Sequence, residues 1–291
     1  MPNTAGVTAI LMWGMLAVFS LQTKAIPPFQ LLFICFSISF LIMMVLRLCR
    51  GQKLLTPPSL TVIQWLVHTG CLFGFHFCYF MAIRFAPAIE VSLIGYLWPL
   101  LLGIYVAPQG LRLYALCGGL LGFLGSVYLV MAGATLQIEA EFIFGYLLAL
   151  LCALIWSGYS WFLSRSHSEV EDIGWVSLVV ALLALAAHVI AETSVYTFTP
   201  LQWANAVLLG LGPIGGAFYL WDTAMKKGNQ SLLASISFAT PVISALALYL
   251  FGLSALSSAV ITAVCLILAG AMIIHRAPVI HARVTAFRNL P

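Results

Sequence analysis

Long apolar stretches run the whole length of the chain, separated by short groups of charged residues, prolines and glycines. Each stretch approaches the ~20 residues that a helix needs to cross the hydrocarbon core of a membrane. Backbone groups in lipid must satisfy their own hydrogen bonds, so the stretches predict helices. The pattern predicts ten membrane-spanning helices, at about residues 4–22, 29–48, 61–84, 87–107, 111–132, 142–163, 173–191, 201–225, 231–251 and 256–275.

Composition supports an all-α integral membrane protein. Of the 291 residues, 63% are hydrophobic and only 7% are charged, and the mean hydropathy is +1.10. A soluble domain has about 25% charged residues, and a disordered chain has far less apolar surface. The net charge of +4 is spread over helix ends, so we expect the lipid bilayer, and no nucleic acid, as a partner.

Lysine and arginine predict the orientation, because cytoplasmic loops carry an excess of them. With ten spans both termini lie on one side, and placing them in the cytoplasm leaves only Lys24 and Arg84 outside. The other ten basic residues then lie inside: Arg47, Arg50, Lys53, Arg112, Arg165, Lys226, Lys227, Arg276, Arg283 and Arg288. The split predicts a multi-pass membrane protein with cytoplasmic termini.

The chain contains an internal repeat. Residues 79–101 and 221–243 share a frame at an offset of 142. Its matched positions are Tyr79/Trp221, Ala82/Ala224, Arg84/Lys226, Ala86/Gly228, Tyr96/Phe238 and Pro99/Pro241, and similar offsets relate Trp13 to Trp156 and Gly125 to Gly270. We therefore predict two five-helix halves, 1–136 and 137–291. Five is odd, so the second half is inverted, as in many secondary transporters, whose substrate lies near the midplane between the halves.

Motifs for enzyme chemistry are missing from the sequence. There is no phosphate-binding GxxxxGK[ST], no HExxH, and no GxSxG with a plausible triad. The seven cysteines form no CxxC pair, and only His76 lies near the centre of a span. We expect no enzyme activity, no cofactor and no metal.

Aromatic residues and one histidine form the predicted substrate site. His76 and Tyr79 share a helix face, and an ionisable group at that depth marks a cavity by default. His76 could bond the substrate, relay protons, or simply bond a neighbouring helix. The remaining candidates are aromatic side chains: Tyr96, Trp98, Trp156, Tyr159, Trp161 and Trp221. Tryptophan and tyrosine usually gather at membrane interfaces, so deep ones favour either a cavity that stacks a flat substrate or plain packing.

Prolines inside spans predict kinks. Pro99 and Pro241 occupy matching positions, each freeing a carbonyl one turn earlier, and we predict that they are gating hinges. One of their two helices should then be bent and the other straighter.

Other polar and small residues fit packing roles. Asp222 is expected to pair with Lys226 one turn later, and His188 and Glu192 to lie at a membrane interface. The GxxxG matches at 118–122 and 212–216 predict close helix packing within one chain, and the chain is expected to be a monomer or a weak homodimer.

These features resemble the EamA-type exporters of the drug/metabolite transporter superfamily, on Trp13-Gly14, Ala82 with its following short loop, Pro99 and Pro241. Residues 84–101, RFAPAIEVSLIGYLWPLL, resemble the branch that exports aromatic amino acids across bacterial inner membranes. The resemblance implies ten helices in two inverted halves and export of Phe, Tyr and Trp, other neutral amino acids and flat cations such as paraquat. The acidic residue that often ends the fourth helix of such repeats is absent, at 105–107 and 250–252.

The leading hypothesis is a secondary transporter that exports amino acids, aromatic ones included, by alternating access. A multidrug or cation exporter is the first alternative, although a mid-membrane carboxylate is missing. A receptor or scaffold without transport is the second, although the repeat and the central prolines count against it.

Overall fold

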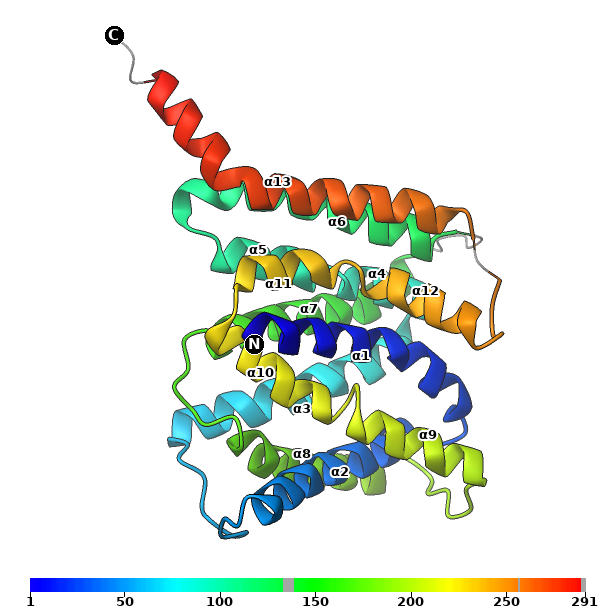
Figure 1. Cartoon of the computed structure of the whole chain (residues 1–291). Coiled ribbons are helices and arrows are strands. Elements are labelled where there is room, and N and C mark those ends of the chain that lie inside the picture. The colour runs from blue at the N-terminus through cyan, green and yellow to red at the C-terminus, as the bar shows by residue number, and fades with distance from the viewer. Residues whose placement is uncertain (133–138, 256, 289–291) are drawn as a thin grey trace.

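The structure is a computed structural model that describes residues 1–132, 139–255 and 257–288. Within those residues every regular element is a helix (Figure 1). Nine helices are long and apolar enough to cross a membrane, and a tenth span results when one bent pair is counted together. The predicted all-α fold with ten spans is confirmed. The predicted boundary between the halves, at residues 136 and 137, lies outside the described residues.

The first half contains α1 (Pro2–Gln22), α2 (Pro28–Cys49), α3 (Val62–Phe85), α4 (Ala88–Gly95), α5 (Trp98–Val106), the short 3₁₀ helix η1 (Gln109–Leu111) and α6 (Arg112–Val130). The second half contains η2 (Ala140–Phe142), α7 (Ile143–Leu163), α8 (Asp172–Ala191), α9 (Pro200–Leu211), α10 (Gly216–Lys227), α11 (Gln230–Ser237), α12 (Thr240–Leu250) and α13 (Ala259–Arg288).

The third span of each half begins with the same sequence feature, a capping box. Thr61 and Gln64 form a capping box at the start of α3, and Thr199 and Gln202 form one at the start of α9. Each box satisfies helix N–H groups that otherwise have no partner. Basic residues then occupy the last turns of α3 and α10, where they favourably meet the negative end of the helix dipole.

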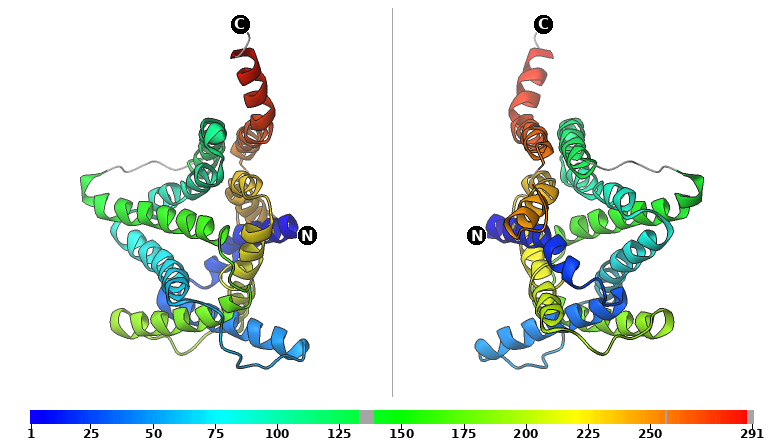
Figure 2. Two further views of the ribbon diagram at one scale, coloured as in Figure 1. Left: turned by 90° about the vertical axis from the view of Figure 1, so that its left-hand side faces the viewer. Right: turned by 90° about the vertical axis from the view of Figure 1, so that its right-hand side faces the viewer.

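The two halves interlock. Helix α1 packs on α10 and α12 of the second half, and its counterpart α7 packs on α3 and α5 of the first. Two other counterpart pairs pack on each other, α2 on α8 and α6 on α13. Figures 1 and 2 show α1, in dark blue, beside the yellow and gold helices of the second half. This exchange is the packing pattern of an inverted repeat.

Three spans are broken near their middles, between α4 and α5, between α9 and α10, and between α11 and α12. Residues 88–106 still form one span, whereas α11 and α12 are bent by 48°. The expected contrast of one bent and one straighter helix is therefore present. The Ser237 carbonyl, which Pro241 cannot bond, accepts a hydrogen bond from the Thr240 hydroxyl at 2.8 Å.

Glycines explain the break between α9 and α10. A Cβ added to Gly215 would lie 1.8 Å from the Gly210 carbonyl oxygen, and one added to Gly216 would lie 2.1 Å from that of Leu211. The GxxxG match at 212–216 therefore permits a break, and the prediction of close helix packing there is wrong. The match at 118–122 does pack closely, because a Cβ on Gly118 would lie 2.5 Å from the Gly270 carbonyl oxygen of α13.

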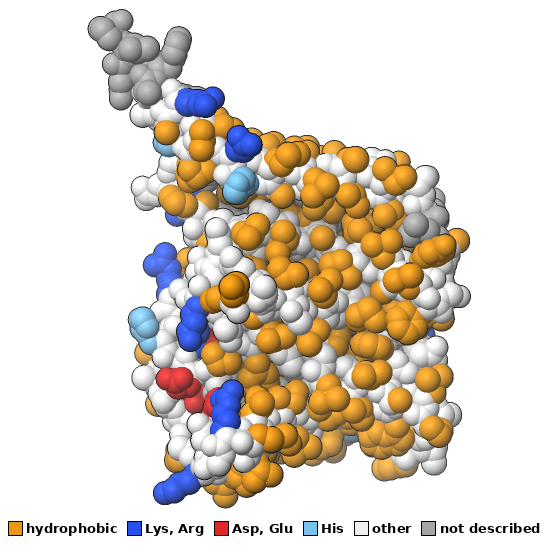
Figure 3. Space-filling view, viewed as in Figure 1, with side chains coloured by type: hydrophobic (Ala, Val, Ile, Leu, Met, Phe, Trp, Pro, Cys, Tyr) orange, Lys and Arg blue, Asp and Glu red, His pale blue; other side chains and the backbone are white. Residues whose placement is uncertain are grey.

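The halves are closed together at one end of the bundle. Helix α5 packs on α11, whereas their repeat counterparts, α12 and α4, make no extended contact with each other. On the face shown in Figure 3, lysines and arginines gather along the edge at this closed end. We call it the basic end. Large hydrophobic side chains cover much of the remaining surface, as expected of a chain that faces lipid.

Candidate aromatic binding site

Four indole rings meet where the two halves join: Trp13 of α1, Trp98 of α5, Trp156 of α7 and Trp221 of α10. We call them the tryptophan cluster. The ring centroid of Trp13 lies 5.0 Å from that of Trp221, 5.6 Å from that of Trp156 and 6.1 Å from that of Trp98. Most of the pairs are edge-to-face, the arrangement that aromatic quadrupoles favour. Each half contributes two rings.

Hydrogen bonds fix the orientation of two of these rings. Trp13 donates its Nε1–H to the Pro213 carbonyl at 3.1 Å, in the break between α9 and α10. Trp221 donates its Nε1–H to the Ser160 hydroxyl at 3.0 Å. A buried indole N–H without an acceptor is costly, so these partners determine which edge of each ring faces the cluster.

Phenylalanine rings surround His76, next to the tryptophan cluster. The Nδ1 of His76 lies 2.8 Å from the Leu72 carbonyl oxygen, which only accepts, so Nδ1 donates to it. The His76 ring packs edge-on against Phe36, Phe75 and Phe218. Phe75 and Phe218 also contact Trp156, with centroids 5.4 and 5.6 Å apart, and so connect His76 to the tryptophan cluster.

The predicted site residues divide into two groups. Trp98, Trp156 and Trp221 belong to the tryptophan cluster, and the Tyr159 ring lies 5.8 Å from that of Trp156. His76 reaches the cluster through its phenylalanine neighbours.

Tyr79, Tyr96 and Trp161 lie outside the cluster. The Tyr79 side chain packs beside Ala82 and Val91, and Tyr96 lies at the break after α4. Trp161 is exposed, with the Arg165 guanidinium 4.7 Å from its ring centroid. Five residues of helix turn it about 140° away from Trp156, so the two rings do not share a helix face.

Trp13 was missing from the predicted site. In the sequence it stood out as the repeat counterpart of Trp156 and as part of the family resemblance, but not as a site residue. That match was the usable signal, because counterpart residues of an inverted repeat meet where the halves join. Phe36 and Phe218 offered no signal, because they are two of 19 phenylalanines.

A chain of polar side chains leads from the cluster toward the basic end. The Tyr159 hydroxyl lies 2.8 Å from Nδ1 of His68, whose Nε2 lies 3.5 Å from the Ser168 hydroxyl. The Lys226 ammonium donates to the Ser168 carbonyl at 2.6 Å and to the Asp222 carboxylate at 2.7 Å. We call these five residues the basic-end network. The expected Asp222–Lys226 pair is confirmed.

A second polar network lies at the opposite end. Glu192 accepts hydrogen bonds from the backbone N–H of Phe29 at 3.1 Å, from His188 at 2.9 Å and from Arg84 at 3.4 Å. His188 also bonds the Ser194 hydroxyl at 2.8 Å. His188 and Glu192 lie at the C-terminal end of α8, as expected, and their side chains are buried there against other parts of the protein. Glu192 is drawn inward because it meets the N–H groups that begin α2.

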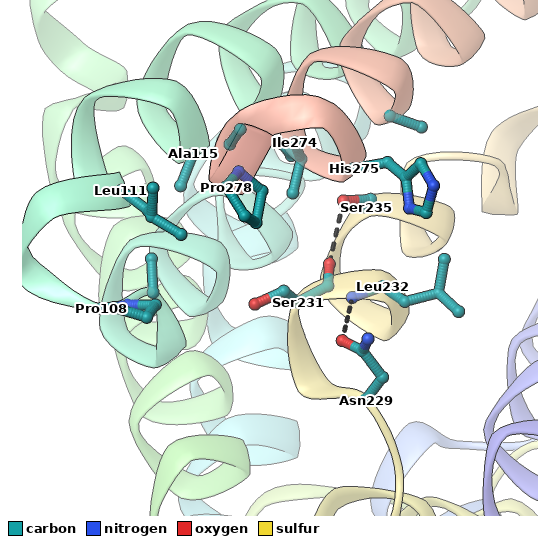
Figure 4. Close-up of a pocket in the computed structure, with 13 residues that line it drawn as sticks. Pro108, Leu111, Ala115, Asn229, Ser231, Leu232, Ser235, Ile274, His275 and Pro278 are labelled. Carbon is teal, nitrogen blue, oxygen red and sulfur yellow. Dashed lines mark hydrogen bonds between the residues drawn. The ribbon is translucent and has the colours of Figure 1, made fainter. Parts of the chain in front are cut away.

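A groove of about 280 Å³ lies between α6, α11 and α13, away from the tryptophan cluster (Figure 4). Apolar side chains line most of the groove. The Ser235 hydroxyl, which also lines it, already donates to the Ser231 carbonyl at 2.9 Å. The groove lies beside Pro278, the proline within α13. It offers a substrate few polar contacts.

Known proteins resemble this chain over nearly its full length. The profile of the EamA-like transporter family matches residues 2–131 and 143–276. The aromatic amino acid exporter YddG of Ancylobacter novellus is 39% identical over 274 residues, which cover 92% of this chain and 94% of that protein. YddG of Salmonella typhimurium is 26% identical over 198 residues, covering 62% of this chain and 66% of that protein.

A solved crystal structure has the same fold. It matches with a TM-score of 0.85 and 36% sequence identity, covering 94% of this chain and 98% of that one. Two matched segments, one in each half, agree with the duplicated fold that the repeat predicts. The protein is thus a multi-pass membrane transporter rather than an enzyme, homologous to an aromatic amino acid exporter. The chain belongs to the EamA-like transporter family.

Proposed function

We propose that this protein exports aromatic amino acids, and other neutral amino acids with them, across a bacterial inner membrane by alternating access. The principal support is the tryptophan cluster, which brings two indole rings from each half together at the junction of the halves. Rings arranged edge-to-face present flat faces to a substrate ring, and offset stacking on such a face contributes about 1 kcal/mol.

The packing of the halves supports alternating access. The basic end is closed by α5 against α11, and the counterparts α4 and α12 stand apart at the other end. Lysine and arginine bias assigns the basic end to the cytoplasm, so this state is closed to the cytoplasm. In the opposite state the counterpart contact of α4 with α12 replaces that of α5 with α11. Tyr79, the repeat counterpart of Trp221, then approaches the cluster.

The charges near the cluster favour neutral amino acids over cations. The indole N–H groups of Trp13 and Trp221 are bonded to a carbonyl and to a hydroxyl, and not to a carboxylate. Asp222, next to Trp221, is already paired with Lys226 at 2.7 Å, so this region has no excess negative charge. A cation exporter needs an excess negative charge at its binding site to offset the cost of removing its substrate from water.

Uptake of labelled phenylalanine into liposomes containing the purified protein tests the proposal. We expect saturable uptake that unlabelled Tyr and Trp compete strongly, Thr and Met weakly, and paraquat least. Trp156→Ala should reduce uptake several-fold, whereas Trp161→Ala, an exposed tryptophan on another face of the same helix, should leave it unchanged. Saturable paraquat uptake without phenylalanine uptake would favour the cation exporter, and uptake of neither would favour a scaffold.

A further inference from the structure

We propose that Asp222 and Lys226 form a head-group subsite that receives the α-ammonium and the α-carboxylate of a zwitterionic amino acid. This inference rests on the proposed function. It gives binding partners to the charged end of the substrate, for which the tryptophan cluster provides none. A zwitterion that leaves water needs an opposite charge for each of its own two.

Asp222 has an acceptor to spare. Its side chain is fully buried, and its Oδ2 accepts from the Lys226 ammonium at 2.7 Å. No group in the described chain donates to its Oδ1. A buried carboxylate oxygen without a donor is unfavourable, and a substrate ammonium is the strongest donor that an amino acid can bring to it.

Lys226 has contacts that a substrate carboxylate can replace. Besides Asp222, its ammonium donates to the carbonyl and the hydroxyl of Ser168, at 2.6 and 3.0 Å. Ser168 lies in the connection between α7 and α8, not in a helix. Exchanging these two neutral acceptors for a carboxylate gives Lys226 a charge-assisted bond.

The pair lies next to the aromatic site. Asp222 directly follows Trp221 on α10, and Trp221 is fully buried in the tryptophan cluster. Tyr159 touches both regions, since its ring packs on Trp156 and its hydroxyl bonds His68 of the basic-end network. An amino acid with its ring among the indoles therefore has its charged end within reach of α10.

The zero net charge of the Asp222–Lys226 pair favours a zwitterion over ligands that carry a single charge. Asp222 and Lys226 together are neutral, and a bound zwitterion keeps the site neutral. A ligand with only an ammonium or only a carboxylate leaves one protein charge without a new partner. A site with buried polar groups rejects such ligands strongly. A buried pair kept only for stability has a weaker rationale, because apolar replacements are often as stable.

Competition against uptake of labelled phenylalanine tests the subsite. The competitors are phenylalanine, phenethylamine, which lacks the carboxylate, and 3-phenylpropionate, which lacks the ammonium. For the wild type we expect phenylalanine to compete at concentrations about tenfold or more below those of the other two. Asp222→Asn should abolish the preference over 3-phenylpropionate, and Lys226→Gln the preference over phenethylamine. Glu169→Gln, next to Ser168, and Lys227→Gln, next to Lys226, change exposed charges and should retain both preferences.

Binding to purified protein in detergent, followed by quenching of tryptophan fluorescence, gives the same ratios for variants that no longer transport. Unchanged ratios in both Asp222→Asn and Lys226→Gln overturn the subsite, even if phenylalanine uptake is intact. Equal competition by all three ligands in the wild type also overturns it. If the wild type neither takes up nor binds phenylalanine, the proposed function itself is overturned. Failure of the proposed function can therefore be told apart from failure of the subsite.

Discussion

The indole N–H of Trp13 on α1 and the carbonyl of Pro213 lie 3.1 Å apart, and this hydrogen bond fixes the tryptophan cluster to the break between α9 and α10. A ring that contacts three other indoles is thereby attached to a point where a span is discontinuous. Movement of α9 relative to α10 must shift Trp13, and with it the proposed binding site.

Trp13→Phe tests this attachment, because phenylalanine keeps an aromatic ring but has no donor. Loss of a hydrogen bond worth about 1 kcal/mol should weaken phenylalanine transport about fivefold. Trp13→Ala should weaken it further. Trp203→Phe on α9, an exposed tryptophan, is the matched control and should transport normally. Full activity of Trp13→Ala would remove Trp13 from the site.

Pro99→Ala and Pro241→Ala test the predicted hinges. Restoring a helical hydrogen bond at either position should slow transport while phenylalanine still binds. Because the prolines lie in opposed halves, the two variants should favour states that open to opposite sides of the membrane. Single cysteines introduced at each end, in a cysteine-free background, report by their labelling which end is open. Pro278→Ala, in a helix outside the cluster, is the control. Wild-type rates in both hinge variants would reduce these prolines to packing features.

Glu192→Gln tests the network at the end opposite the basic end. The amide cannot replace a carboxylate that receives N–H groups of α2, His188 and Arg84. We expect a loss of about 1–2 kcal/mol in the free energy of unfolding, seen as a lower melting temperature in detergent. Glu141→Gln is an exposed carboxylate control from the same end of the second half. Equal melting temperatures would show that the network is dispensable.

Gly118→Ala tests the close approach of α6 to α13. The new Cβ would lie 2.5 Å from a backbone oxygen of Gly270, which cannot rotate away. Forcing the helices apart should cost about 1–3 kcal/mol, again measured by thermal unfolding. Gly70→Ala, where nothing lies within 4 Å of the added Cβ, should be neutral or slightly stabilising.

Reporters fused to the C-terminus test the orientation. A reporter active only in the cytoplasm should be active, because the basic end holds the end of α13 and the lysines and arginines that gather there in Figure 3. Activity of a reporter that functions only in the periplasm would reverse the assignment of the two ends.

The spans and the repeat were predictable because lipid imposes a length and an apolar composition that any sequence must show. The site was only partly predictable. Trp156 and Trp161 look alike in the sequence, and only the rotation of α7 separates a buried ring from an exposed one. The inward placement of Glu192 depends on α2, far away in the chain, and no local pattern reports such a partner.

The exchange of α1 and α7 between the halves has a consequence for biosynthesis. When the first half has been synthesised, α10 and α12, on which α1 packs, do not yet exist. Until they are made, α1 lies in the membrane without these packing partners. Neither half can therefore mature alone. Expressed as separate polypeptides, the halves should be degraded singly and survive only when produced together.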